Sequence, residues 1–118
     1  MKPSVAIDFD GVLCEEAWPD IGCASADIIN AARHARDAGV RLILNTCREG
    51  AALEDAVSFC ESRGLGFDAV NENLPERIQY FGGDCRKVSA TYIVDDRAVG
   101  YTAEAAIELL LRLAGKQG

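Results

Sequence analysis

Acidic residues directly follow two apolar runs of the sequence. Asp8 and Asp10 come after the run 5–7, and Asp95 and Asp96 come after the run 91–94. Carboxylates gathered at one place repel each other, since a like pair at about 4 Å costs on the order of 4 kcal/mol at an effective dielectric of roughly 20. A hard divalent cation with oxygen ligands offsets that repulsion, and Mg²⁺ suits the set because it takes carboxylates together with water and phosphate oxygens. We therefore predict an Mg²⁺ site formed by these four residues.

Groups suited to phosphate lie after the apolar run 40–44 and shortly before the run 91–94. Thr46 and Arg48 follow the run 40–44, and Lys87 stands shortly before the last run. A hydroxyl and two cations can hold the phosphate oxygens that a metal does not. Gly11 lets the backbone approach a ligand closely because it has no Cβ. These four residues predict binding of a small phosphorylated substrate.

The spacing of Asp8 and Asp10 allows a division of labour. Residues two apart in an extended segment share a face, so both carboxylates can address one phosphate. We predict that Asp8 attacks phosphorus and forms an aspartyl-phosphate intermediate. Asp10 is predicted to protonate the leaving oxygen and later to accept the proton of the hydrolytic water, provided that its neighbours raise its pKa.

Some of these residues have competing interpretations. Aspartate is common in turns after strands, so the first acidic pair could be purely structural. Thr46 could cap a following helix, a role compatible with binding phosphate. Arg86 and Arg77 compete with Lys87 for the cationic role.

Arg48 is the most ambiguous of the candidates. It either contacts the phosphate or substrate, or it pairs with an acidic neighbour, Glu49 or Asp55. His34, the single histidine, lies in a polar stretch of a predicted helix. A histidine-based triad or a zinc hydrolase is therefore disfavoured.

Apolar runs alternate with amphipathic segments along the chain. The predicted strands cover 5–7, 40–44, 67–70 and 91–94, and the predicted helices cover 25–37, 50–63, 73–81 and 102–113. Ser25 is a predicted N-cap, and Asn73 with Glu76 forms a predicted capping box. This alternation predicts an α/β fold, a three-layer α/β/α Rossmann-like arrangement with a doubly wound parallel sheet covered on both faces. Because the strands of such a sheet end on one edge, where ligands bind, we expect the candidate residues to meet there.

Composition narrows the class of protein. The 118 residues carry 12 Lys plus Arg against 19 Asp plus Glu, a formal charge of −7, and 49% are hydrophobic. One domain spanning 1–118 is expected, with a core large enough to exclude intrinsic disorder. The acidity argues against nucleic acid, and the short apolar runs argue against a membrane span or a signal peptide. Five cysteines without a C-x-x-C spacing indicate reduced thiols, so a cytoplasmic protein is expected.

The set of motifs resembles the haloacid dehalogenase superfamily over essentially the whole chain. The matching residues, in chain order, are Asp8-Phe9-Asp10-Gly11-Val12, Thr46, Lys87 and Asp95-Asp96. The resemblance implies that Asp8 is the nucleophile and a metal ligand, and that Asp10 is the acid/base and offers its backbone carbonyl to Mg²⁺. It also implies phosphate binding by Thr46 and Lys87, and a metal ligand at Asp95 with Asp96 beside it.

Little room exists for the cap domain that many members of that superfamily carry. Residues 12–24, which include Trp18, suffice only for a flap, and the segment between Thr46 and Lys87 is mostly used by predicted helices and a strand. The chain is thus expected to be a capless, HAD-like protein. Its open site could accept a large substrate or be closed by a second subunit in a homo-oligomer.

These observations favour a Mg²⁺-dependent phosphatase and leave two alternatives. A receiver domain would carry its acidic pair first and its acceptor aspartate in the middle, where only Asp68 is available. A phosphate-binding or regulatory module on the same scaffold would bind without turnover. The substrate itself is not predicted, because many phosphorylated compounds present the same group to the same residues.

Overall fold

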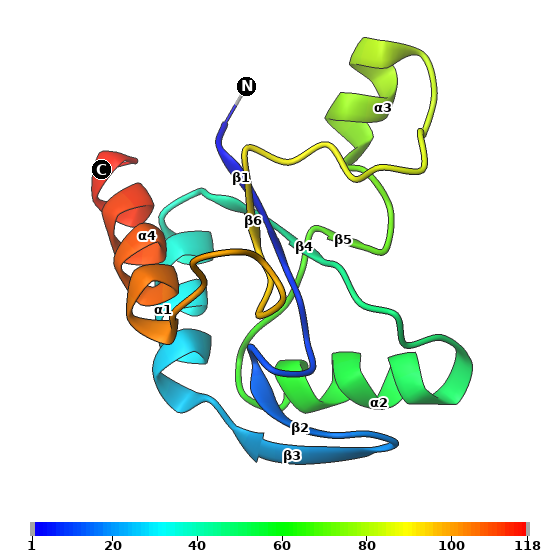
Figure 1. Cartoon of the computed structure of the whole chain (residues 1–118). Coiled ribbons are helices and arrows are strands. Elements are labelled where there is room, and N and C mark those ends of the chain that lie inside the picture. Colours follow the sequence, from blue (N-terminus) through cyan, green and yellow to red (C-terminus); the bar gives the residue numbers. More distant parts are fainter. Residues whose placement is uncertain (1, 118) are drawn as a thin grey trace.

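A four-stranded parallel sheet forms the centre of the computed structural model, which describes residues 2–117 (Figure 1). The strand order is β5-β4-β1-β6, in which β1 pairs with β4 from Ser4 to Ile7 and with β6 from Val5 to Ile7. The strands are β1 (Ser4–Ile7), β4 (Arg41–Leu44), β5 (Ala69–Val70) and β6 (Tyr92–Val94). The predicted parallel sheet is therefore confirmed, with the third and fourth strands shorter than expected.

Four helices cover the sheet unevenly. They are α1 (Ala26–Asp37), α2 (Gly50–Glu61), α3 (Pro75–Phe81) and α4 (Ala103–Lys116). Val5 and Ile7 on one face of β1 belong to a core that includes buried residues of α1, α2 and α4. Ala6 and Ile43 belong to a second, smaller cluster with Leu74, at the start of α3. The fold is thus the expected Rossmann-like α/β/α arrangement, with a thick layer on one face and a thin one on the other.

The buried strand β1 fixes the position of the loop that follows it. All four residues of β1 are fully buried, and Phe9 beyond them is buried too. The Phe9 ring packs edge-on against Phe59 of α2, with the ring centroids 5.7 Å apart. Since burying a large apolar side chain contributes about 1.5–3 kcal/mol, these contacts anchor the loop that carries the first acidic residues.

The predicted capping box at the start of α3 is wrong. The Asn73 side chain instead donates to Asp84 and to the Cys85 carbonyl, which ties α3 to the segment before β6. Glu76 accepts two hydrogen bonds from Arg41 at the start of β4. Both side chains are drawn to partners distant in sequence, and α3 begins at Pro75 after an extended Leu74.

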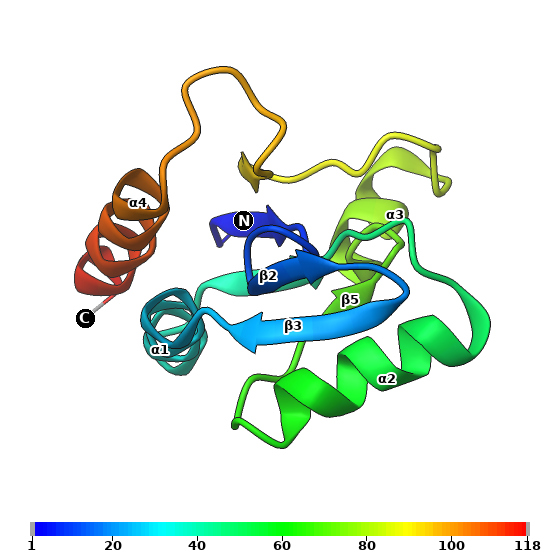
Figure 2. The ribbon, with the colours of Figure 1, turned by 60° about the horizontal axis from the view of Figure 1, so that its bottom comes forward.

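The expected flap is a β-hairpin. Strands β2 (Cys14–Ala17) and β3 (Asp20–Ala24) pair antiparallel as a separate two-stranded sheet. Trp18 and Pro19 form the turn between them. Figure 2 shows the hairpin beside α2 and α1, on the side of the sheet towards which β1 runs.

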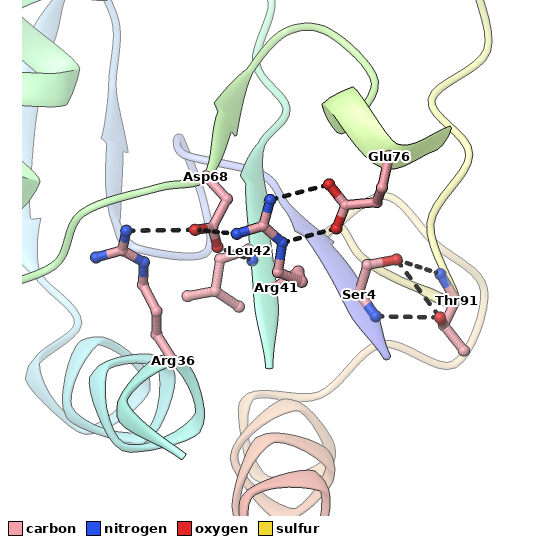
Figure 3. Close-up of polar contacts among 7 residues, drawn as sticks. All are labelled: Ser4, Arg36, Arg41, Leu42, Asp68, Glu76 and Thr91. Atoms are coloured by element: carbon pink, nitrogen blue, oxygen red, sulfur yellow. Dashed lines mark hydrogen bonds and ion pairs between the residues drawn. The ribbon is translucent and has the colours of Figure 1, made fainter. Parts of the chain in front are cut away.

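An ion-pair network holds the amino edge of the sheet (Figure 3). Arg41 donates to Asp68 at 2.9 Å and to both oxygens of Glu76 at 2.8 and 2.9 Å. Asp68 also accepts from Arg36 and from the Leu42 amide. The hydrogen bonds from Arg41 lower the pKa of Glu76 below its ordinary value. Every carboxylate of this network therefore has a cationic partner.

Two further expectations concern thiols and membranes. All five cysteines are free, as expected, with Cys14 and Cys60 buried. No helix within residues 2–117 combines the length and the apolar character needed to cross a membrane.

Candidate active site

A cavity of about 300 Å³ opens at the carboxyl edge of the sheet. Its walls come from the loop after β1, the hairpin, the loop after β4 and the loop after β6. The lining residues are Asp8, Asp10, Glu16, Trp18, Thr46, Cys47, Arg48, Asp95, Asp96 and Arg97. Six of the eight predicted site residues are thus brought to one cavity, and Gly11 and Lys87 lie outside this lining.

Three acidic residues form a cluster inside the cavity. One carboxylate oxygen from each of Asp8, Asp95 and Asp96 lies within 4.8 Å of the others. Burial, a hydrogen bond with Asp96 and the charge of Asp95 together raise the pKa of Asp8 to about 7. A hydrogen bond between two carboxyl groups requires one shared proton, so the cluster keeps a proton that a cation would displace.

This donor set fits a hard divalent cation. Three carboxylates from two adjacent strand ends converge on one point, and a cation bound there would offset their mutual repulsion. Mg²⁺ prefers oxygen ligands of this kind. Asp8, Asp95 and Asp96 are therefore the residues that would hold it.

Gly11 lies directly beside the acidic cluster. Its φ of +88° lies in the left-handed region, and a Cβ there would overlap the Asp96 carboxylate oxygen Oδ2. The predicted close approach at Gly11 is thus made by the Asp96 side chain. A side chain at this position would therefore require the Asp96 carboxylate to shift.

Asp10 is paired with Arg48, outside the acidic cluster. The Arg48 Nε and Nη2 atoms donate to the two Asp10 oxygens, each at 2.8 Å. Arg48 is 2% exposed and also donates to the Asp20 carbonyl at 2.8 Å. The partner of Arg48 is therefore Asp10, neither Glu49 nor Asp55.

Arg48, which we predict to contact the phosphate or the substrate, lines the cavity with its guanidinium paired to Asp10. The donors of its guanidinium face Asp10 and the hairpin carbonyls of Pro19 and Asp20. The guanidinium lies 5.1 Å from the Phe9 ring centroid and 5.0 Å from that of Trp18. Arg48 thus joins the first loop to the hairpin tip. The side chain of Asp10, predicted as a metal ligand, is correspondingly directed to Arg48.

Thr46 lines the cavity as predicted. Its hydroxyl accepts from the Arg48 amide at 3.2 Å, and its amide donates to the Asn71 side chain at 2.8 Å. The alternative that Thr46 caps the next helix is wrong, because α2 begins at Gly50 after Glu49. Asn71 follows β5 with a φ of +53° and clamps this loop. Sequence reasoning missed Asn71, although a polar residue directly after a strand is the signal it used elsewhere.

Among residues 2–117, those that line the cavity do not include Lys87. Its side chain is exposed, and its carbonyl accepts from Asn73. Arg77, one of its competitors, donates to the Ser89 hydroxyl at 3.1 Å. Arg97, which directly follows the second acidic pair, lines the cavity instead. Sequence reasoning missed Arg97 and Glu16 as site residues because exposed charged residues are common on protein surfaces.

Comparisons with known proteins identify a relative but no activity. No protein-family model and no curated protein matches the chain. A solved structure of the conserved protein coded by locus from Bacteroides thetaiotaomicron is similar, with 32% sequence identity and a TM-score of 0.79. The match covers 98% of this chain and 91% of that chain. The chain therefore belongs to the same family as that conserved protein and shares its fold.

Proposed function

We propose that the protein is a Mg²⁺-dependent phosphomonoester hydrolase of the haloacid dehalogenase type, acting through an aspartyl-phosphate at Asp8. The observation that carries the proposal is the convergence of Asp8, Asp95 and Asp96 within 4.8 Å in a cavity that Thr46 also lines. The chain order of these residues, and their positions at strand ends, also support it.

Two residues carry the proposed chemistry. An Asp8 oxygen bonds to phosphorus while the bond from phosphorus to the ester oxygen breaks, and Asp10 gives that oxygen a proton so that the alcohol leaves. Water then attacks phosphorus, Asp10 accepts its proton, and the bond from phosphorus to Asp8 breaks, which releases phosphate and restores both carboxyl groups. The Thr46 hydroxyl, which lines the same cavity, would donate to a phosphate oxygen.

The proposed mechanism requires Asp8 to be ionised and Asp10 to be protonated. Mg²⁺ at Asp8, Asp95 and Asp96 would supply positive charge that favours ionised Asp8 and offsets the charge of the phosphate. Asp10 needs the opposite state, a proton. Both of its oxygens accept from Arg48, so protonation requires Arg48 to release one of them.

Phosphate release from a panel of phosphomonoesters tests the proposal. We expect Mg²⁺-dependent turnover that a chelator abolishes and that Asp8→Asn lowers by more than about a thousandfold. Asp37→Asn, at the exposed end of α1, is the matched control and should keep full activity. A folded wild-type protein that releases no phosphate with excess Mg²⁺ would refute the enzyme.

A phosphate-binding module is the second candidate. Its support is the position of Lys87 outside the cavity and the pairing of both Asp10 oxygens. This candidate predicts binding of beryllium fluoride or phosphate together with Mg²⁺, without turnover at any enzyme concentration. A receiver domain receives no such support, because Asp68 lies in the ion-pair network at the opposite edge (Figure 3).

A further inference from the structure

Trp18 is the single tryptophan of the chain and stands exposed at the cavity. It lies in the hairpin turn, is 57% exposed, and lines the same cavity as Asp8. Large aromatic side chains gain most from burial, so an aromatic ring held in the open at a cavity wall is suited to contact a ligand.

The ring is held in this place by Arg48. The guanidinium carbon lies 5.0 Å from the Trp18 ring centroid, within the range of a cation–π contact. Arg48 is itself fixed by both Asp10 oxygens and by the hairpin carbonyl of Asp20. Trp18 is therefore coupled through one buried side chain to the residue proposed to protonate the leaving oxygen. Because Trp18 and Asp10 both contact the Arg48 guanidinium, Trp18 lies on the side of the cavity from which Asp10 would protonate the leaving oxygen.

The charges of the cavity restrict the leaving group further. Five carboxylates and two guanidinium groups line it. With a divalent cation bound and Asp10 protonated, the charges of the lining balance, and the phosphate that enters then makes the occupied site net negative. A leaving group with additional negative charge is therefore repelled.

We infer that Trp18 forms a leaving-group subsite for phosphomonoesters whose alcohol carries an uncharged aromatic ring. The inference rests on the proposed phosphatase function and names its substrate class. The ring of the substrate stacks on the indole, while its phosphate lies at Asp8 and Thr46.

A pair of matched esters tests the subsite. Phenethyl phosphate and cyclohexylethyl phosphate have leaving alcohols of the same carbon skeleton and similar acidity, so they differ chiefly in the aromatic ring. We expect wild-type kcat/KM to favour the phenethyl ester by about two- to tenfold, mostly through KM, as aromatic pairing predicts. Trp18→Ala should remove this preference, and Trp18→Phe should keep part of it. A carboxylate added to the phenyl ring should raise KM.

A control variant and a binding measurement complete the test. Tyr80→Ala removes another exposed aromatic ring, on α3 outside the cavity, and should leave the preference unchanged. In Asp8→Asn, where the expected slow turnover would leave the ester intact during a titration, the phenethyl ester should change the fluorescence of Trp18 at lower concentration than the cyclohexyl ester does.

The outcomes separate the two proposals. Equal kcat/KM for both esters in the wild type, with the same fluorescence titration for each, overturns the subsite and leaves the phosphatase intact. Absence of Asp8-dependent phosphate release from either ester overturns the phosphatase and the subsite together.

Discussion

The two edges of the parallel sheet treat charged side chains in opposite ways. At the amino edge, Asp68 and Glu76 each accept hydrogen bonds from Arg41, and Arg36 adds a further contact to Asp68 (Figure 3). At the carboxyl edge, Asp8 and its two acidic neighbours face one another with a raised pKa at Asp8. The same fold thus places a self-sufficient network at one end and, beside the paired Asp10 and Arg48, an incomplete acidic network at the other. Incomplete networks are expensive for stability, which is why they are typical of sites that bind something.

Removing one acidic side chain at the carboxyl edge should stabilise the protein without metal and lower its activity, which would separate the two edges most clearly. Asp96→Asn relieves the repulsion on Asp8, so the metal-free protein should melt at a higher temperature than the wild type. Activity should fall by about a hundredfold or more, because even partners outside the first ligand shell typically cost about 10–100-fold. Calorimetry in chelator and Mg²⁺ titration of both proteins measure the two effects. An unchanged affinity for Mg²⁺ would remove Asp96 from the metal site.

The pH dependence of Mg²⁺ binding should show that the acidic cluster at the carboxyl edge, unlike the paired amino edge, takes up a proton. The pKa of Asp8 is raised from 3.8 to about 7 in the folded state. The folded protein therefore holds a proton that the unfolded chain has lost, and the stability this group contributes declines as the pH rises from 3.8 to about 7. Mg²⁺ must displace that proton, so its affinity should fall by up to about tenfold per pH unit below 7. Melting temperatures with and without Mg²⁺ from pH 5.5 to pH 8 check this, and a constant Mg²⁺ effect over that range would contradict it.

At the amino edge, loss of a cation should affect stability and leave the chemistry unchanged. Arg41→Met leaves Glu76 without its bidentate partner and Asp68 with fewer contacts. We expect a loss of about 1–2 kcal/mol in the free energy of unfolding, since Arg41 is partly exposed. Urea denaturation measures it. Arg36→Met, which removes the longer and more exposed contact to Asp68, should cost less. A large drop in kcat for Arg41→Met would mean that the two edges are coupled.

The smallest effect is expected at Glu76. Its pKa is lowered by Arg41, so the stability that this pair provides is present above the ordinary value of 4.5 and is lost as the pH falls through the folded-state pKa. Glu76→Gln should cost about 0–1 kcal/mol at neutral pH, as for other exposed pairs. The difference from the wild type should narrow in denaturation experiments below pH 4.5. A difference that grows on acidification would contradict the sign.

Much of the fold and part of the site follow from local patterns in the sequence. Strand β1 and helix α1 were predicted within about one residue, because apolar period and burial agree in both elements. Asp8, Asp95 and Asp96 were predicted to meet because parallel strands end together.

The remaining site contacts depend on side-chain pairing over long distances. The partner of Arg48 is 38 positions away, at Asp10, and nothing in the spacing distinguishes it from nearer acids. The Asn73 side chain likewise donates to Asp84 and to the Cys85 carbonyl and does not cap α3. Lys87 was assigned by sequence order, yet the segment that carries it passes along the thin face of the sheet, where Val88 packs.

The outer position of β6 has a consequence for the behaviour of the protein in concentrated solution. β6 ends the sheet on one side, and its Tyr92 and Ile93 are 38% and 50% exposed. A short apolar strand at the rim of a sheet is a template for self-association, which natural proteins commonly restrain with a lysine. Ile93→Lys should therefore raise the concentration at which light scattering first detects aggregates.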